Sequence, residues 1–327
     1  MSDLLIRRRN LLIRKQEEEL NIRAVCFKAD GEQTVAITKV GSAPTITMQY
    51  SYDGMNWDAW DLTPLPFGGS TKVYVRGVNN TKFGSGIRNY QYFTFGTEAY
   101  VYVSGIVESL LDGENEVTTL TAGYVFINLF VGQGALRSAK DLKFEMADNL
   151  NGGAGVYMSM FQNCSNLLYA PLELPAKSLG SDSCYQEMFR GCTRLLTAPV
   201  LPATTLSNQC YRHMFNNCKS LVNAHELPAT TLTNNCYYFM FFGCTSLVNA
   251  PKLPATELAA SCYYNMFYGC TSLKTIRCHA KVTANNATVN WLNGVKTSGI
   301  FYGYSEYGWS SGVSGIPTTW TFEELTD

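Results

Sequence analysis

The chain has 327 residues, of which 46% are hydrophobic and 16% charged, and its formal net charge is −1. A chain of this length buries substantial cores, so we expect two or three modules. The near-zero charge excludes a general attraction to nucleic acid or acidic lipid. No run of eighteen apolar residues offers a membrane span.

The first twenty residues, within a segment that we bound at 1–22, predict a helical docking peptide. The tetrapeptide LLIR occurs at residues 4–7 and again at 11–14. A spacing of seven places both apolar clusters on one face of a helix, which would bind a partner protein or self-associate. The alternative is a solvated tail. The predicted docking residues are Leu4, Leu5, Ile6, Arg7, Arg8, Arg9, Leu11, Leu12, Ile13 and Arg14.

Residues 23–112 predict a β-sandwich-like module. Runs such as TVAITKV, TITMQYSY and TKVYVRGV are rich in β-branched and aromatic residues, and turn signals such as DG, GS and GG separate them. Such short runs between turn signals are typical of antiparallel sheets.

Residues 113–282 predict a repeat array. The clearest copies read CYRHMFNNCKSLVNAHELPATTL and CYYFMFFGCTSLVNAPKLPATEL, and Met214, Met240 and Met266 lie twenty-six residues apart. A fixed period of this length predicts a solenoid. We interpret residues 129–142 as a degenerate capping repeat, because the outer face of an array needs a cover.

Within one unit, Cys262, Met266, Cys270 and Leu273 fall at i, i+4, i+8 and i+11, a spacing that predicts one face of a helix. The prolines that follow predict an extended return. We therefore expect an α+β chain with an N-terminal helix, the β-module, the solenoid and a small β-rich C-terminal cap over residues 283–327.

The repeat frame MFxGCTSLxxAPxLPATxL resembles the BspA-like leucine-rich repeats of surface proteins of gut anaerobes and of structural proteins of their phages. The resemblance covers about residues 129–282. It implies a leucine-rich-repeat layout and a head or tail fibre or appendage subunit of a phage virion. The alternative is a bacterial cell-surface adhesin. The first twenty residues lack the apolar core of a secretory signal, which favours the virion.

Eleven cysteines leave three alternatives, namely packing, disulfides between repeats, or a metal site. Pairs such as Cys210 and Cys218 are eight residues apart, which is about 12 Å along a helix. That separation is too long for a disulfide, whose Cα atoms lie within about 7 Å, and for two zinc ligands. We favour packing, because buried cysteine behaves as a small hydrophobe, and expect Cys218→Ser to lower stability.

Catalysis finds little support in the sequence. His213, His225 and His279 lie at positions that the repeat frame explains as surface or capping sites. No phosphate-binding loop, nucleophile elbow or HExxH motif is present. We therefore expect a protein that is not an enzyme and that binds no cofactor or metal.

Aromatic residues recur beside the buried stripe of the repeats and in the terminal stretch. Aromatic rings with a polar end suit recognition of sugars or protein surfaces, the alternative being packing between repeats. We expect other virion proteins at the N-terminus, a host surface protein or glycan on the array, and a homo-oligomer, a trimer by analogy, with no nucleic acid or membrane insertion. The candidate binding residues are Tyr238, Phe242, Tyr264, Tyr268, Tyr304 and Trp309.

Overall fold

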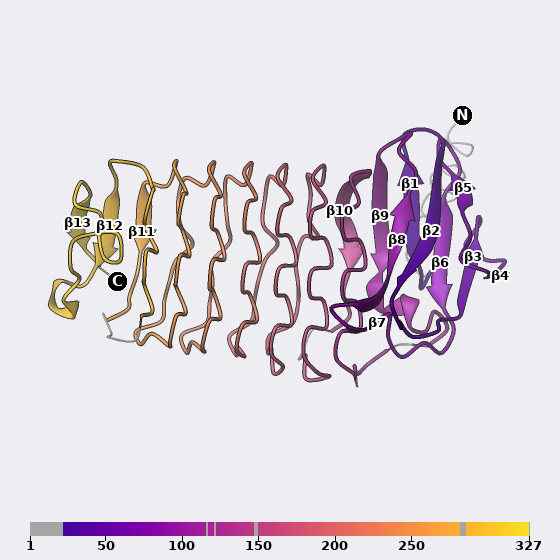
Figure 1. Cartoon of the computed structure of the whole chain (residues 1–327), viewed down its shortest axis with the longest axis horizontal. Helices are drawn as coiled ribbons and strands as arrows, with labels where there is room; N and C mark the ends of the chain where they lie inside the picture. Colours follow the sequence, from indigo (N-terminus) through magenta and orange to yellow (C-terminus); the bar gives the residue numbers. More distant parts are fainter. Residues whose placement is uncertain (1–21, 116, 121, 147–149, 282–285, 327) are drawn as a thin grey trace, which may run out of the picture.

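The computed structural model describes residues 22–115, 117–120, 122–146, 150–281 and 286–326. A module of two β-sheets lies at one end, and a stack of repeat units extends from it to a small module at the other end (Figure 1). The predicted docking peptide lies outside the described residues.

The N-terminal module consists of a six-stranded and a four-stranded sheet. Pairing is antiparallel except between β9 and β10, which brings the start of the array into the larger sheet. In sheet order the larger one contains β10 (Leu136–Lys143), β9 (Val101–Ile106), β1 (Val25–Ala29), β6 (Val73–Gly77), β3 (Met48–Ser51) and β4 (Asp58–Trp60). The smaller contains β5 (Leu65–Phe67), β2 (Gln33–Val40), β8 (Asn89–Phe95) and β7 (Gly84–Gly86).

The two sheets pack against each other through aromatic side chains. Phe27 of β1 contacts Phe93 of β8 with ring centroids 5.0 Å apart, and Phe67 of β5 at 6.4 Å. Phe93 also stacks on Phe130, in the first unit of the repeat array, at 5.4 Å. One hydrophobic core therefore runs from the sheets into the array.

Each repeat unit begins with a chain of tight turns. Among the described residues, seven segments carry three left-handed residues at intervals of four, with Gly or Asn always in the third place. These residue types adopt the left-handed conformation most readily. The triplets are Tyr124/Asn128/Gly132, Gly155/Ser159/Asn163, Ser183/Glu187/Gly191, Gln209/His213/Asn217, Asn235/Phe239/Gly243, Ser261/Asn265/Gly269 and Asn286/Asn290/Gly294.

Backbone hydrogen bonds in these segments alternate between the unit and its neighbour. The N–H of Gln186 donates to the carbonyl of Ser183 within its own turn at 3.1 Å. The N–H of Tyr185 donates to the carbonyl of Cys210 in the next unit at 3.0 Å. The same alternation recurs along the array, so many backbone N–H groups find their acceptor carbonyls in the neighbouring unit.

The α+β prediction is wrong. The described residues contain thirteen strands, two short 3₁₀-helices, η1 (Val107–Leu110) and η2 (Ser305–Tyr307), and no α-helix. The predicted repeat helix is replaced by the turns, because a left-handed residue at every fourth position reproduces the i, i+4 spacing of a helical face. A leucine-rich repeat has a strand and a helix or 3₁₀ turn in each unit; the returns here make isolated bridges such as Tyr169 to Thr197.

Two columns of stacked rings fill the array. Neighbouring centroids lie 5.3–6.1 Å apart in the tyrosine column and 5.3–5.7 Å apart in the phenylalanine column. The tyrosine column contains Phe126, Tyr157, Tyr185, Tyr211, Tyr237, Tyr263, Trp291 and Trp309. The phenylalanine column contains Phe93, Phe130, Phe161, Phe189, Phe215, Phe241 and Phe267.

The array cysteines lie between these columns and the backbone. The ten from Cys164 to Cys278 are fully buried and form no disulfide. The thiol of Cys218 donates to the carbonyl of Phe189 in the preceding unit at 3.1 Å, and the thiol of Cys244 to that of Phe215 at 3.0 Å. Burial raises the pKa of the Cys164 thiol to about 12. This burial supports the packing alternative, with the thiol as an extra link between units.

The array continues into the terminal module. The turn segment at 286–294 repeats the left-handed pattern of the other units. It contains no cysteine or methionine, so the repeat frame did not identify it from the sequence. On either side of this segment in the chain, β11 (Thr275–Arg277) before it and β12 (Ile300–Gly303) and β13 (Thr321–Glu324) after it form a parallel sheet. At the opposite end, residues 129–142 are not an outer cap, because Phe93 of the β-module covers Phe130.

A buried carboxyl group joins the β-module to the repeat array. Glu108 of η1 is fully buried and accepts hydrogen bonds from the hydroxyl of Tyr157 at 2.5 Å and the N–H of Glu145 at 2.9 Å. Burial raises the pKa of Glu108 to about 7, although both hydrogen bonds lower it. Desolvation therefore dominates at this junction.

None of the helices in the described part of the chain has the length and apolar character that crossing a membrane requires.

Candidate binding surfaces

Four of the predicted binding residues form one cluster on the turn segments of adjacent repeats. Tyr238 stacks on Tyr264 with centroids 5.0 Å apart, and Phe242 stacks on Tyr268 at 4.9 Å. All four are half-buried, whereas their neighbours in the tyrosine column are fully buried. Each ring thus packs on the adjacent unit and still reaches the surface, so the two alternatives of packing and recognition are compatible.

Two residues that were not among the predicted binding residues, Phe239 and His213, complete this outer aromatic cluster; the repeat frame predicted only a surface or capping role for His213. The ring of Phe239 lies 5.1 Å from that of Phe242 and 5.8 Å from that of Tyr264. His213 lies 4.9 Å from Phe239 and 5.7 Å from Tyr238. A signal was present, because both residues replace the Asn265 of the most regular copy. We define the outer aromatic cluster as His213, Tyr238, Phe239, Phe242, Tyr264 and Tyr268.

His213 serves this cluster as a neutral ring. Burial, and then the nearby charge of Arg212, lowers the pKa of His213 to about 4. The imidazole is therefore uncharged at neutral pH and is half-buried against two aromatic rings. The guanidinium of Arg212 covers the Tyr238 ring at 5.2 Å, which supplies the cationic edge of the surface. Of the other two histidines, His225 is exposed and His279 is buried beside Tyr304.

Phe239 holds a backbone conformation that is unfavourable for its side chain. Its φ is 56°, whereas the equivalent place is held by asparagine in three other segments, at Asn128, Asn265 and Asn290. A left-handed conformation costs an ordinary residue about 1–2 kcal/mol. The left-handed conformation itself belongs to every segment, with Ser159, Glu187 and His213 at the same place, but a bulky aromatic residue there costs backbone energy that asparagine would largely avoid.

Relief of this strain is testable with a matched pair of variants. We expect Phe239→Asn to be more stable than Phe242→Asn by roughly 1 kcal/mol, because both lose a half-buried ring but only the first relieves a left-handed backbone. Urea unfolding of the two variants measures this difference. An equal or larger loss for Phe239→Asn would show that the backbone at 239 is not strained.

Tyr304 and Trp309 lie apart from the outer aromatic cluster. Trp309 ends the tyrosine column, stacked on Trp291 at 5.3 Å, and Tyr304 contacts His279 at 5.8 Å. Both line a hollow of about 280 Å³ in the terminal module. The predicted candidates therefore fall into two separate surfaces.

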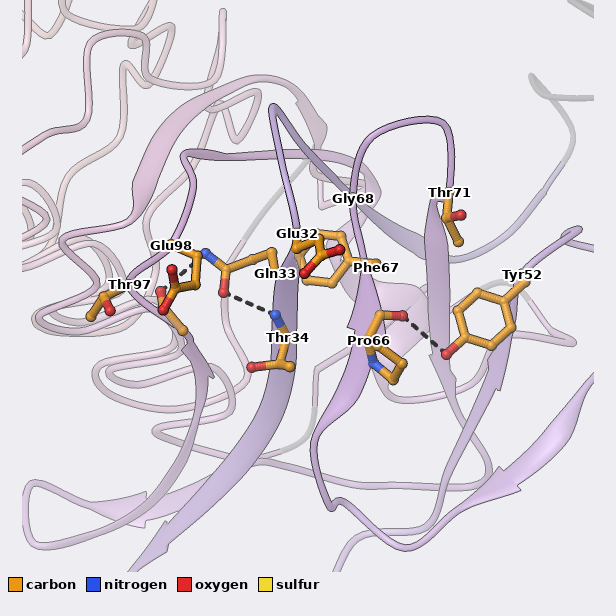
Figure 2. Close-up of a pocket in the computed structure, with 11 residues that line it drawn as sticks. Glu32, Gln33, Thr34, Tyr52, Pro66, Phe67, Gly68, Thr71, Thr97 and Glu98 are labelled. Carbon is orange, nitrogen blue, oxygen red and sulfur yellow. Dashed lines mark hydrogen bonds between the residues drawn. The ribbon is translucent and has the colours of Figure 1, made fainter.

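A larger hollow of about 1060 Å³ opens in the β-module (Figure 2). Its amide Gln33 is committed to backbone carbonyls of Gly96 and Ala99, and the hydroxyl of Tyr52 donates to Pro66. The remaining polar groups are threonine hydroxyls and the carboxylates of Glu32 and Glu98. This set suits neutral or cationic ligands, and its side chains offer no imidazole or thiol for nucleophilic catalysis.

The described ranges contain no group of three or more histidine, cysteine or acidic side chains arranged to hold a metal ion. The predicted docking residues from Leu4 to Arg14 lie outside the described residues.

Comparison of the chain with protein-family models, with curated proteins and with solved structures gives no match.

Proposed function

We propose that the chain is a non-enzymatic structural and binding protein, a head or tail fibre or appendage subunit of a phage virion. In this role residues 4–14 attach it to other virion proteins, and the array displays the outer aromatic cluster to a protein or glycan of the host surface. The subunits form a homo-oligomer, for which a trimer is the first expectation.

The observation that carries this proposal is the outer aromatic cluster. Its rings belong to three successive units whose backbones are bonded to each other, as in the bond from His213 to Tyr238 at 2.9 Å. Side chains held in this way lose little conformational entropy when a partner binds. The three tyrosines of the cluster, Tyr238, Tyr264 and Tyr268, also carry hydroxyl groups that can form hydrogen bonds with a polar ligand such as a glycan or a protein surface.

The surface is also chemically selective. Phe239, Phe242 and neutral His213 give an apolar centre, and Arg212 gives a positive edge beside Tyr238. An apolar centre with a polar rim is the usual anatomy of a recognition surface. The strain at Phe239 adds weight, because packing alone would be served by asparagine, as in the equivalent position of the next unit.

A second candidate is a bacterial cell-surface adhesin. The repeat frame favours it equally, because it resembles repeats from surface proteins of gut anaerobes as well as from phages. The two candidates share the binding surface and differ in what the N-terminal segment attaches to.

The binding half is tested with the full chain on host cells and a broad glycan panel. We expect the wild type to bind and the double variant Tyr264→Ala, Tyr268→Ala to lose at least tenfold in affinity, because two stacked rings carry the contact. The exposed Ile87→Ala in the β-module, outside every hollow described above, is the control and should bind normally. Absence of wild-type binding to any cell or glycan would refute the proposal.

The attachment half is tested by deleting residues 2–20. The truncated chain is expected to fold and bind ligand but to be absent from purified virions, as measured by mass spectrometry of the particles. Incorporation at the wild-type level would exclude the docking role of residues 4–14, and finding the full chain on bacterial envelopes would select the adhesin.

A further inference from the structure

The hollow in the terminal module is lined by aromatic and hydroxyl-bearing side chains. Figure 1 shows this module at the end of the array opposite the two-sheet β-module. Its volume of about 280 Å³ is just below the range of about 300–1000 Å³ typical of small-molecule sites. The lining residues are Tyr304, Ser305, Trp309, Ser311, Ile316, Pro317, Thr318, Trp320 and Phe322.

The lining combines aromatic walls with hydroxyl groups at the mouth. Trp309 and Phe322 are half-buried and both pack on Phe301, at 5.1 and 6.2 Å. Trp320 is held by a hydrogen bond from its Nε1 to the carbonyl of Lys296 at 2.8 Å. Three exposed residues, Ser305, Ser311 and Thr318, contribute hydroxyl groups to the lining.

These groups match the two chemical characters of a pyranose ring. The C–H bonds on one face of a sugar carry partial positive charge and are attracted to the negative face of an aromatic ring. The sugar hydroxyls at its rim exchange hydrogen bonds with serine and threonine, which both donate and accept.

The indole N–H of Trp309 adds an independent observation. It is buried and has no hydrogen-bond acceptor among the residues that the structure describes. A buried donor without a partner costs roughly 1–3 kcal/mol. Because this N–H is closed to a water-sized molecule, a ligand in the hollow meets the ring of Trp309 and not its N–H.

Charge selects among sugars. None of the nine lining residues is charged. The neighbourhood holds charges of both signs, because Glu306, Glu323 and Glu324 are exposed and the ammonium of Lys281 lies over the Tyr307 ring at 5.4 Å. Burying the charge of an anionic sugar in the uncharged hollow itself would be costly.

We propose that this hollow is a binding site for a single neutral pyranose, such as a hexose or N-acetylhexosamine unit of a surface glycan. The inference deepens the proposed function, on which it rests, by naming a second contact and its ligand class. Binding places the sugar against the ring of Trp309.

The test titrates the full chain with methyl glycosides of neutral hexoses, N-acetylhexosamines and sialic acid, followed by tryptophan fluorescence and saturation-transfer NMR. Thr318→Trp fills the mouth of the hollow from an exposed position, so folding is retained. Thr319→Trp adds the same ring at the neighbouring exposed residue outside the lining and is the matched control.

We expect a neutral glycoside to bind the wild type and Thr319→Trp equally, and Thr318→Trp at least tenfold more weakly. Preference for the sialoside, equal binding by both threonine variants, or binding of a proline-rich peptide in place of any sugar would overturn the inference. Host-cell binding that persists in Thr318→Trp but is lost in the Tyr264, Tyr268 double variant would leave the proposed function standing without this site.

Discussion

Replacing Phe215 by alanine is expected to lower the free energy of unfolding by about 3–5 kcal/mol, the range found for deleting a buried aromatic side chain. Phe215 is fully buried at the middle of the array, between Phe189 at 5.7 Å and Phe241 at 5.4 Å. The carbonyl of Phe215 also accepts a hydrogen bond from the thiol of Cys244. A cavity there would remove contacts to both adjacent units.

The position of the cavity has a second consequence. Stability in a repeat array is close to a sum of unit and nearest-neighbour terms, so weakening a central interface separates the two halves. We expect the unfolding curve of Phe215→Ala to broaden or to split into two transitions, measured by urea unfolding with circular dichroism.

The outer ring variant Tyr268→Ala is the control for Phe215→Ala. Tyr268 is half-buried, so its removal should cost far less and keep a single transition. Equal losses for the two variants would mean that the stacked columns do not support the array.

Replacing Glu108 by glutamine is expected to abolish a loss of stability that the wild type shows as the pH rises from about 5 to 8. The pKa of Glu108 is raised from 4.5 to about 7 in the folded chain. The folded state therefore holds a proton that the unfolded state releases. The stabilising effect of this proton is complete below pH 4.5 and is lost as the pH rises through about 7.

The size of this effect follows from the same shift. One unit of pKa corresponds to about 1.4 kcal/mol, so the Glu108 shift is worth up to about 3 kcal/mol across this range. Glutamine keeps the shape and remains uncharged, and its N–H₂ and carbonyl can retain one or both of the contacts to Tyr157 and the N–H of Glu145.

The measurement is the free energy of unfolding at pH 5 and pH 8 for wild type, Glu108→Gln and the exposed Glu173→Gln. The pKa of His213, lowered to about 4, acts in the opposite sense below pH 6.5, but it is present in all three proteins and cancels in their differences. A wild-type profile parallel to that of Glu108→Gln would contradict a raised pKa at the junction.

The repeat positions show how far the sequence reaches into this fold. Along residues 236–244, two buried residues alternate with two half-buried ones, and a helix face and a chain of turns both produce that pattern. The period of twenty-six and the apolar stripe therefore identified which side chains pack inside. They did not decide whether the backbone forms a helix or a chain of turns, because the spacing of apolar residues does not depend on the sign of φ.

The candidate site divides in the same way. Tyr238, Phe242, Tyr264 and Tyr268 could be grouped from their equivalent places in the repeats, and the structure brings them together. Phe239 was missed because its outward position depends on a left-handed turn. Of the residues that line the terminal hollow, the sequence predicted only Tyr304 and Trp309 as binding residues. The others come from separate segments of the chain that the parallel sheet brings together.

The sequence by itself determined that neighbouring units stack through cysteine, methionine and aromatic side chains, because burial of apolar area repeats wherever those residues repeat. Only the tertiary structure decided between turns and helices, and only it brought Glu108 against Tyr157. The physical reason is the same in both cases. The deciding hydrogen bonds, to the next unit or across the junction, join residues that are far apart in the chain, and a local sequence pattern does not predict such contacts.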